Sequence, residues 1–403
     1  MSKNIFFQSS INANYFKKNL YSKDKKILNK TINNIFTSLE NKEDVFHSFS
    51  KKFKFNFKNS ELLKFNKFKS VILIGMGGSA LGAEAMYSFC SNARKNFFFF
   101  LNDLNQLKIE TIKKDINLKK NLFIIISKSG NTLETLININ FFKDKINKKN
   151  TIIITEKKTN LLNKFAKNKK ILNVNLKDYI GGRFSVLSEV GMIPGYFMGL
   201  KIAYFRKNLL NLFKLKEKNS LLDNVVKLSH IYKSKKINSI VLLNYAPEVN
   251  EFLYWLQQLI AESLGKKGKG ILPVVSLAPR DHHSLLQLYL DGPKDKLFYI
   301  FSLKLNKRMK INQNMFEKTF GYVENKDLSI VKEAQKNALI KILKNKNIPY
   351  QEFIINNKNE ETLGELFSYF IMETVLIGKL LGINPFDQPA VEQVKNLTKK
   401  YLS

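Results

Sequence analysis

The sequence predicts an α/β protein with two doubly wound parallel sheets and with helical arms at its N- and C-termini. Three observations support this prediction. Short apolar runs alternate with helix-like segments over residues 66–210, a second series of the same kind occupies residues 220–385, and the two ends of the chain lack this alternation. Alternating strand and helix patterns are typical of parallel sheets that helices cover on both faces. A length of 403 residues allows two or three domains.

The elements of the first half follow from local patterns. Residues 1–65 are polar and rich in lysine and asparagine, and they predict an N-terminal helical arm. A long apolar stretch from Ser188 to Phe205 predicts one helix, and the lysine-rich stretch after it, to about residue 220, predicts a link between domains. Five short apolar runs predict the strands of the first sheet: VILIG (71–75), FFFFL (97–101), LFIII (122–126), TIIIT (151–155) and ILNVN (171–175).

The second half repeats the pattern. Three runs predict strands: SIVLLN (239–244), ILPVVSL (271–277) and LFYIFSL (297–303). Helical periodicity is found near residues 248–264, 281–290, 329–346 and 361–381. Residues 386–403 predict a C-terminal helix, with Pro389 in its first turn.

The net charge of +34 is carried mostly by lysine, because only five of the 67 basic residues are arginine. Lysine, asparagine, isoleucine and phenylalanine are all abundant, which is typical of A+T-rich codons. The best candidate for a nucleic-acid surface is Lys51–Lys69, where phenylalanines alternate with lysines. We favour the interpretation that these phenylalanines pack inward and the lysines face water, so no nucleic-acid partner is expected.

Other classes of protein are also disfavoured. No apolar run approaches the ~18 residues that span a bilayer, and the N-terminus lacks an apolar stretch typical of a signal peptide. The single cysteine, Cys90, permits neither an internal disulfide nor a cysteine metal cluster. We therefore expect a cytoplasmic protein without a membrane partner and without a metal site.

Thirteen of the 18 glycines lie in four places, residues 75–82, 130, 181–199 and 265–270. The first group follows a predicted strand, and a loop rich in hydroxyl groups follows another. Backbone and side-chain donors at a helix N-terminus favour an anion, so these loops predict a phosphate site. Its candidate residues are Gly78, Ser79, Ser127, Lys128, Ser129 and Thr132.

Two alternatives apply to these loops. The serine and threonine residues could simply cap a helix. The glycine cluster also matches a variant of the dinucleotide-binding fingerprint, but Asp103 lies farther from Gly75 than the ~20 residues that this motif requires.

Six motifs together resemble the glucose-6-phosphate isomerase family, whose domains have the sugar isomerase fold. They are GMGGSALG (75–82), SKSGNTLET (127–135), GGRFSVLSEVG (181–191), AESLGK (261–266), HSLLQL (283–288) and FDQPAVEQVK (386–395). The resemblance covers about residues 70–395. It implies a homodimer that interconverts glucose 6-phosphate and fructose 6-phosphate through a cis-enediolate, without metal or cofactor. Ala390 departs from the family pattern, which usually has glycine there.

This reaction moves a proton between C1 and C2 of a sugar, so it needs a base and fixed positive charge near the developing oxyanion. Glu262 is the predicted base, and Gln258, one helical turn earlier, should face the same pocket. Arg183 follows two glycines and is the predicted stabiliser of the enediolate oxygens. The alternatives are that Glu262 pairs with Lys266 on a helix surface and that Arg183 forms a structural ion pair.

The resemblance alone selects three further residues. His283 matches the ring-opening histidine, which the family places at the active site of the partner subunit. Lys395 matches the residue near the ring oxygen, Gln388 matches one that hydrogen-bonds to substrate, and the C-terminal helix would thus complete the site. Two other functions stay open: a bifunctional glucose/mannose-6-phosphate isomerase and a noncatalytic phosphosugar-binding regulator.

Overall fold

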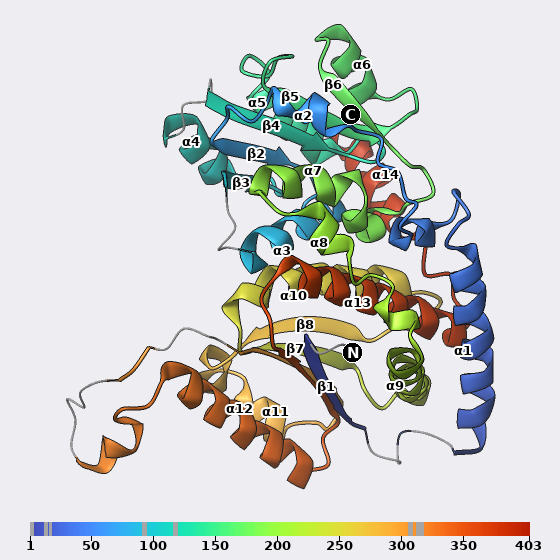
Figure 1. The fold of residues 1–403 in the computed structure, drawn as a ribbon, viewed down its shortest axis with the longest axis vertical. Helices are drawn as coiled ribbons and strands as arrows, with labels where there is room; N and C mark the ends of the chain where they lie inside the picture. The colour runs from blue at the N-terminus through green and yellow to red at the C-terminus, as the bar shows by residue number, and fades with distance from the viewer. Residues whose placement is uncertain are drawn as a thin grey trace.

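The computed structural model describes residues 4–11, 15, 18–90, 95–115, 120–304, 309–311 and 318–403. The strands form two five-stranded sheets, in the orders β3-β2-β4-β5-β6 and β1-β10-β9-β7-β8. Figure 1 shows one sheet above the other, with helices α3, α10 and α13 between them. The predicted α/β class is thus confirmed.

All pairings in the first sheet are parallel. Each of the five predicted runs forms a strand: β2 (Ser70–Ile74), β3 (Phe97–Leu101), β4 (Asn121–Ile126), β5 (Thr151–Glu156) and β6 (Leu172–Leu176). Every residue of β4 and β5 is buried, as expected where helices cover both faces. Those helices are α3 (Leu81–Phe89) on one face and α4 (Gln106–Asp115), α5 (Leu133–Phe141) and α6 (Leu161–Asn168) on the other.

The second sheet is mixed, which corrects the prediction of a purely parallel one. Its strands are β7 (Ser239–Asn244), β8 (Leu272–Leu277), β9 (Lys296–Leu303), β10 (Tyr350–Ile355) and β1 (Ile5–Ser10). Strand β1 lies antiparallel to β10 at the edge of the sheet. The prediction that residues 1–65 form a helical arm is therefore wrong for β1, because Ile5 is buried and Phe7 packs 5.1 Å from the Phe353 ring. The sequence patterns also did not predict strand β10.

Two helical predictions need correction. The single helix predicted for residues 188–205 is divided into α7 (Glu189–Met198) and α8 (Ile202–Arg206), because Gly199 adopts φ +90°. The predicted link is partly helical, since α9 (Leu215–Ser234) begins before residue 220. The domain boundaries stay predictions.

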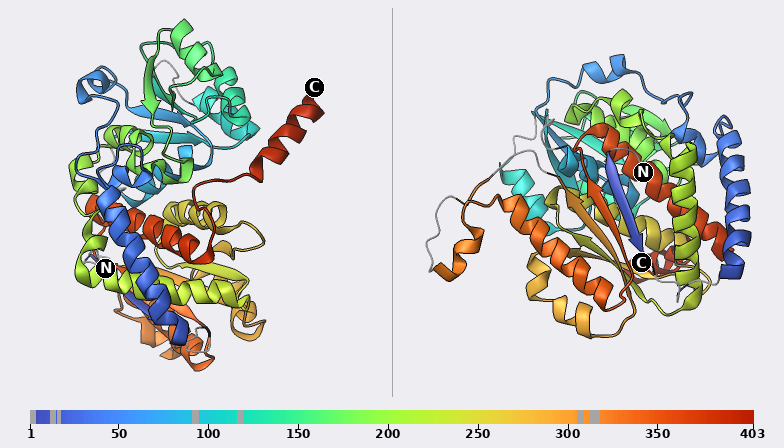
Figure 2. Two further views of the ribbon diagram at one scale, coloured as in Figure 1. Left: turned by 90° about the vertical axis from the view of Figure 1, so that its right-hand side faces the viewer. Right: turned by 60° about the horizontal axis from the view of Figure 1, so that its bottom comes forward.

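The remaining helices include α1 (Lys18–Ser38), α2 (Asn59–Leu63), α10 (Asn250–Leu264), α11 (Leu286–Asp291), α12 (Leu328–Asn345), α13 (Glu360–Leu381) and α14 (Val391–Leu402). None of the helices in the described ranges combines the length and apolar character that a membrane span needs. Helix α14 buries no residue and projects away from the body of the protein (Figure 2, left).

The segment Lys51–Lys69 packs as the favoured interpretation of its sequence predicts, with most of its phenylalanines inside and its lysines in water. Phe53, Phe57, Phe65 and Phe68 are buried, and the lysines of the segment are exposed. The alternation of the two residue types thus follows from an inward and an outward face.

Candidate active site

Two glycine-rich loops meet with almost no space between their backbones. A Cβ atom on Gly78 would lie 2.3 Å from the carbonyl carbon and oxygen of Gly182, so only glycine allows the contact. Gly77 has φ +52°, and a Cβ there would lie 2.7 Å from the Gln258 amide nitrogen. The loop after β2 is therefore fixed against both the Gly182–Leu187 turn and helix α10.

Arg183 is delivered by that turn into the interior, where its side chain is only 1% exposed. The Trp255 indole of α10 donates to the Arg183 carbonyl (3.2 Å), which fixes the backbone at this point. The guanidinium makes five hydrogen bonds: Nε to Ser263 Oγ (2.8 Å), Nη1 to Glu262 Oε2 (3.1 Å) and Gln388 Oε1 (2.8 Å), and Nη2 to the carbonyls of Pro385 (2.6 Å) and Asp387 (3.0 Å).

These bonds use all five N–H groups of the guanidinium. Burial lowers the pKa of Arg183, and the negative charge of Glu262 opposes that effect. The side chain thus connects the end of α10 to the segment that follows α13. Three residues that the sequence predicts for the site, Arg183, Glu262 and Gln388, are brought together here.

Glu262 lies in the last turn of α10, with one third of its side chain exposed. Its Oε1 accepts a hydrogen bond from Gln258 Nε2 (2.9 Å), and its Oε2 faces Arg183. The alternative pairing with Lys266 is wrong, because the Lys266 amine contacts Asp387 Oδ1 (2.8 Å). Glu262 instead borders a groove of about 560 Å³ between α3 and α10.

The predicted phosphate loop leads from β4 into α5. The Ser127 and Thr132 hydroxyls lie 2.8 Å apart, and Ser129 Oγ lies 3.4 Å from Thr132 Oγ1. The backbone N–H of Gly130 donates to Ser127 Oγ (3.2 Å). Thr132 makes no side-chain capping bond to α5, so capping does not account for its hydroxyl.

Ser79 approaches this loop from the neighbouring strand. A Cβ atom on Gly75 would lie 3.0 Å from Ser79 Cβ and 3.1 Å from the carbonyl oxygen of Ile126, which directly precedes Ser127. The loops after β2 and β4 therefore meet at the carboxyl edge of the sheet, where ligands of open α/β sheets bind.

Lys128 does not join these hydroxyls. Its amine contacts Glu156 Oε1 (3.2 Å) and donates to the Asp178 carbonyl (2.7 Å). Glu156 is buried at the end of β5, and a buried carboxylate needs a cationic partner. The sequence could not reveal this competing partner.

The structure does not bring His283 or Lys395 to Glu262. His283 is exposed at the end of the Arg280–His283 turn, and its neighbour His282 contacts the Tyr245 hydroxyl through Nε2 (2.7 Å). Lys395 is exposed on α14 and pairs with Glu392 (2.6 Å). Within the described ranges, neither has a hydrogen bond or ion pair with Glu262 or Arg183.

Glu84 is a further candidate that the sequence analysis did not identify. It lies in the first turn of the helix that follows the glycine cluster. Its carboxylate lines the same groove as Glu262 and accepts a hydrogen bond from Asn102 Nδ2 (2.7 Å). Burial raises the pKa of Glu84 to about 7, with a further contribution from the negative charge of Glu251.

The Glu84→Gln variant should raise the melting temperature at pH 8 more than at pH 5. Because the pKa of Glu84 is raised in the folded protein, the free energy of unfolding falls as the pH rises from the ordinary pKa of a glutamate toward 7. Over that range the folded state must hold an unfavourable negative charge. Glutamine stays neutral and can keep the bond to Asn102. Thermal unfolding at both pH values measures the effect, with the exposed Glu43→Gln as control. Equal shifts at the two pH values would contradict it.

No group of three or more histidine, cysteine, aspartate or glutamate residues suited to a metal ion occurs in the part of the chain that the structure describes. Cys90 is buried, and burial raises the pKa of its thiol to about 12.

Solved structures share this architecture. A hypothetical protein from Thermus thermophilus superposes with a TM-score of 0.84 at 23% identity and covers 98% of this chain and 100% of its own. A glucose-6-phosphate isomerase from Chlamydia trachomatis superposes with a TM-score of 0.78 at 17% identity, covering 100% of this chain and 89% of its own. At these identities the likeness shows the fold.

Sequence comparison is more specific. Glucose-6-phosphate isomerase from Methanocaldococcus jannaschii is 32% identical over 82% of this chain and 84% of its own length. The enzyme of the same name from Campylobacter jejuni is 32% identical over 83% of this chain and 86% of its own. The phosphoglucose isomerase family model matches residues 16–271, which include the glycine loops, Arg183 and Glu262. With more than half of the sequence matched by the family model and relatives 32% identical over more than four fifths of the chain, the chain belongs to the phosphoglucose isomerase family.

Proposed function

We propose that this protein interconverts glucose 6-phosphate and fructose 6-phosphate, a step of glycolysis and gluconeogenesis. The observation that carries the proposal is the direct contact between Glu262 and Arg183 beside an open groove. A carboxylate base and a permanent positive charge are the two groups that isomerisation through an enediolate requires. Relatives named glucose-6-phosphate isomerase, which align with most of the chain, support the choice of substrate.

In this mechanism, Glu262 removes the proton from C2 of the open-chain aldose and returns it to C1. The proton transfer neutralises Glu262 while negative charge develops on the substrate oxygens. Arg183 Nη1, which donates to Glu262 Oε2, is then held less strongly by that carboxyl group. The same N–H can turn to the enediolate oxygen at the moment when charge appears there.

The substrate phosphate binds between the loops after β2 and β4. Ser79, Ser127, Ser129 and Thr132 supply hydroxyl groups, and the N-terminus of α5 contributes its positive dipole end. The close packing at Gly78 holds the loop after β2 next to Arg183. Gln258 and Gln388, each bonded to one of the two reacting groups, position them and face the sugar hydroxyls.

A coupled assay with glucose 6-phosphate, fructose 6-phosphate and mannose 6-phosphate tests the proposal. Turnover of the first two alone supports it, and additional turnover of mannose 6-phosphate would indicate a bifunctional isomerase. Binding of sugar phosphates without turnover of any would indicate a regulator and would contradict the proposal.

We also propose that the protein acts in the cytoplasm as a homodimer in which His283 serves the partner subunit. His283 is exposed and belongs to a turn at the edge of the second sheet, so a second copy can approach it. Lys395 is held outside the groove on the projecting α14, and a role at the ring oxygen requires that helix to dock.

Mixing the inactive variants Glu262→Gln and His283→Ala should restore activity if His283 crosses the interface. Mixed dimers would then hold one site with both lesions and one with neither. Random exchange of equal amounts should give about a quarter of wild-type activity, since about half of the dimers are mixed. No recovery after verified subunit exchange would mean that each chain completes its own site.

A further inference from the structure

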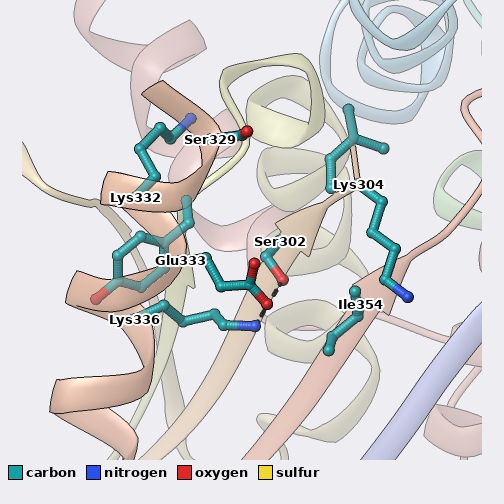
Figure 3. Close-up of a pocket in the computed structure, with 9 residues that line it drawn as sticks. Ser302, Lys304, Ser329, Lys332, Glu333, Lys336 and Ile354 are labelled. Atoms are coloured by element: carbon teal, nitrogen blue, oxygen red, sulfur yellow. Dashed lines mark hydrogen bonds between the residues drawn. The ribbon is translucent and has the colours of Figure 1, made fainter. Parts of the chain in front are cut away.

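A second cavity lies at the carboxyl edge of the second sheet. It has a volume of about 320 Å³ and is bordered by the ends of β9 and β10 and by the first turns of α12. Figure 3 shows Lys304 on one side and Ser329, Lys332, Glu333 and Lys336 of α12 on the other, with Ser302 between them. None of these residues belongs to the groove that contains Glu262.

The pairing of the strands places this cavity where the first sheet has its phosphate loop. In the first sheet Ile74, the last residue of β2, pairs with Ile125 of β4. In the second sheet Asn244, the last residue of β7, pairs with Phe301 of β9. Strands β4 and β9 are each central in their sheet, and the next α-helix along the chain is α5 after β4 and, beyond a longer connection, α12 after β9.

The equivalence extends to the lysines. Lys128 follows Ile125 by the same number of residues as Lys304 follows Phe301. In the first sheet Lys128 is held by the buried Glu156. In the second sheet, Lys304 has no ion-pair partner among the described residues and is exposed at the cavity.

The cavity carries an excess of positive charge. Lys336 is buried and pairs with Glu352 (2.7 Å), and its amine also donates to Ser302 Oγ (3.4 Å). Lys332, like Lys304, forms no ion pair within the described ranges, and Glu333 is the sole acidic residue of the lining. Two lysines therefore stay available to an anion, and Ser329 adds a hydroxyl in the first turn of α12.

We propose that this cavity is a second, noncatalytic site for a small phosphate monoester. The phosphate binds to Lys332 and Ser329, which lie together on α12, and Lys304 turns toward it from the opposite side of the cavity (Figure 3). Glu333 accepts a hydrogen bond from a hydroxyl of the ligand. The volume is at the lower limit for ligand pockets, which suits a sugar phosphate better than a nucleotide. The lining contains no arginine, so the planar guanidinium that Arg183 presents beside Glu262 has no counterpart at this site. The comparison of the sheets rests on the phosphate loop assigned under the proposed function.

Titration calorimetry with glycerol 3-phosphate, a phosphate monoester that cannot undergo this isomerisation, tests the proposal on the full chain. We expect two sites per chain in the wild type. Lys332→Gln and, separately, Lys304→Gln should weaken one of them at least about tenfold, because a charge-assisted hydrogen bond is lost. Ser127→Ala should weaken only the other site. Lys346→Gln removes the same charge from the exposed end of α12 and should change neither.

The outcomes separate this proposal from the proposed function. A single site that Ser127→Ala weakens would overturn the second site and leave the isomerase assignment intact. If both sites persist in Ser127→Ala and one of them is lost in Lys332→Gln, the result would support the second site. The same result would contradict the assignment of residues 127–132 as the phosphate-binding loop. Equal weakening by Lys332→Gln and Lys346→Gln would indicate general attraction to a basic surface and overturn the proposal. Glycerol without phosphate should not bind.

Discussion

The Glu262→Gln variant should lose nearly all turnover, with kcat lower by about 10²–10⁴ and little change in the affinity for a sugar phosphate. Glutamine cannot take a proton from carbon, but it keeps the shape of the side chain and can still accept from Arg183. Gln258 accommodates the change, because its Oε1 is buried without a hydrogen-bond partner among the described residues. Rotation of the Gln258 amide lets that oxygen accept from the new side chain.

Steady-state kinetics in both directions measures the loss, and thermal unfolding shows that the variant is folded. Glu43→Gln is the matched control, since Glu43 is exposed and lies outside the groove. If kcat of Glu262→Gln stays close to the wild-type value, another group removes the proton and the assigned mechanism is wrong.

The Arg183→Lys variant should lose both activity and stability. Lysine has three N–H donors in place of five and no planar fork, so it cannot serve Glu262, Gln388, Ser263 and two carbonyl groups together. Each buried acceptor left without a donor costs about 1–3 kcal/mol, and the free energy of unfolding should fall accordingly. We expect kcat to fall more than KM rises, because the fixed charge acts mainly on the enediolate.

Arg206→Lys separates the two effects. Arg206 also donates to three backbone carbonyls, those of Leu187, Ser48 and Ser50, and burial lowers its pKa to about 10. It does not contact Glu262, so this variant should be less stable with a nearly unchanged kcat. If Arg183→Lys reduces kcat no more than Arg206→Lys does, Arg183 is a structural residue only.

The first sheet could be predicted almost residue by residue because its inner strands β2, β4 and β5 are buried on both faces and all five strands coincide with short apolar runs. Strand β1 could not, since only Ile5 of its residues is fully buried and its partner is distant in the chain. Glu262 and Arg183 meet through tertiary packing, so the sequence assigned both to one site through the family motifs but did not predict their direct contact. Lys128 shows the limit of a motif, because the buried Glu156 that holds its amine belongs to the next strand.

The pairing of β1 with β10 has a consequence for biosynthesis. Ser10 and Tyr350 lie side by side in the finished sheet, yet the ribosome makes them far apart in time. At the usual 5–20 residues per second, the nascent chain carries β1 without its neighbour for roughly 20–70 s. The first sheet is synthesised completely in that interval, whereas the second sheet stays open at one edge until β1 docks. Unpaired sheet edges promote aggregation, so translation that stops before residue 350 should yield a product that depends on chaperones.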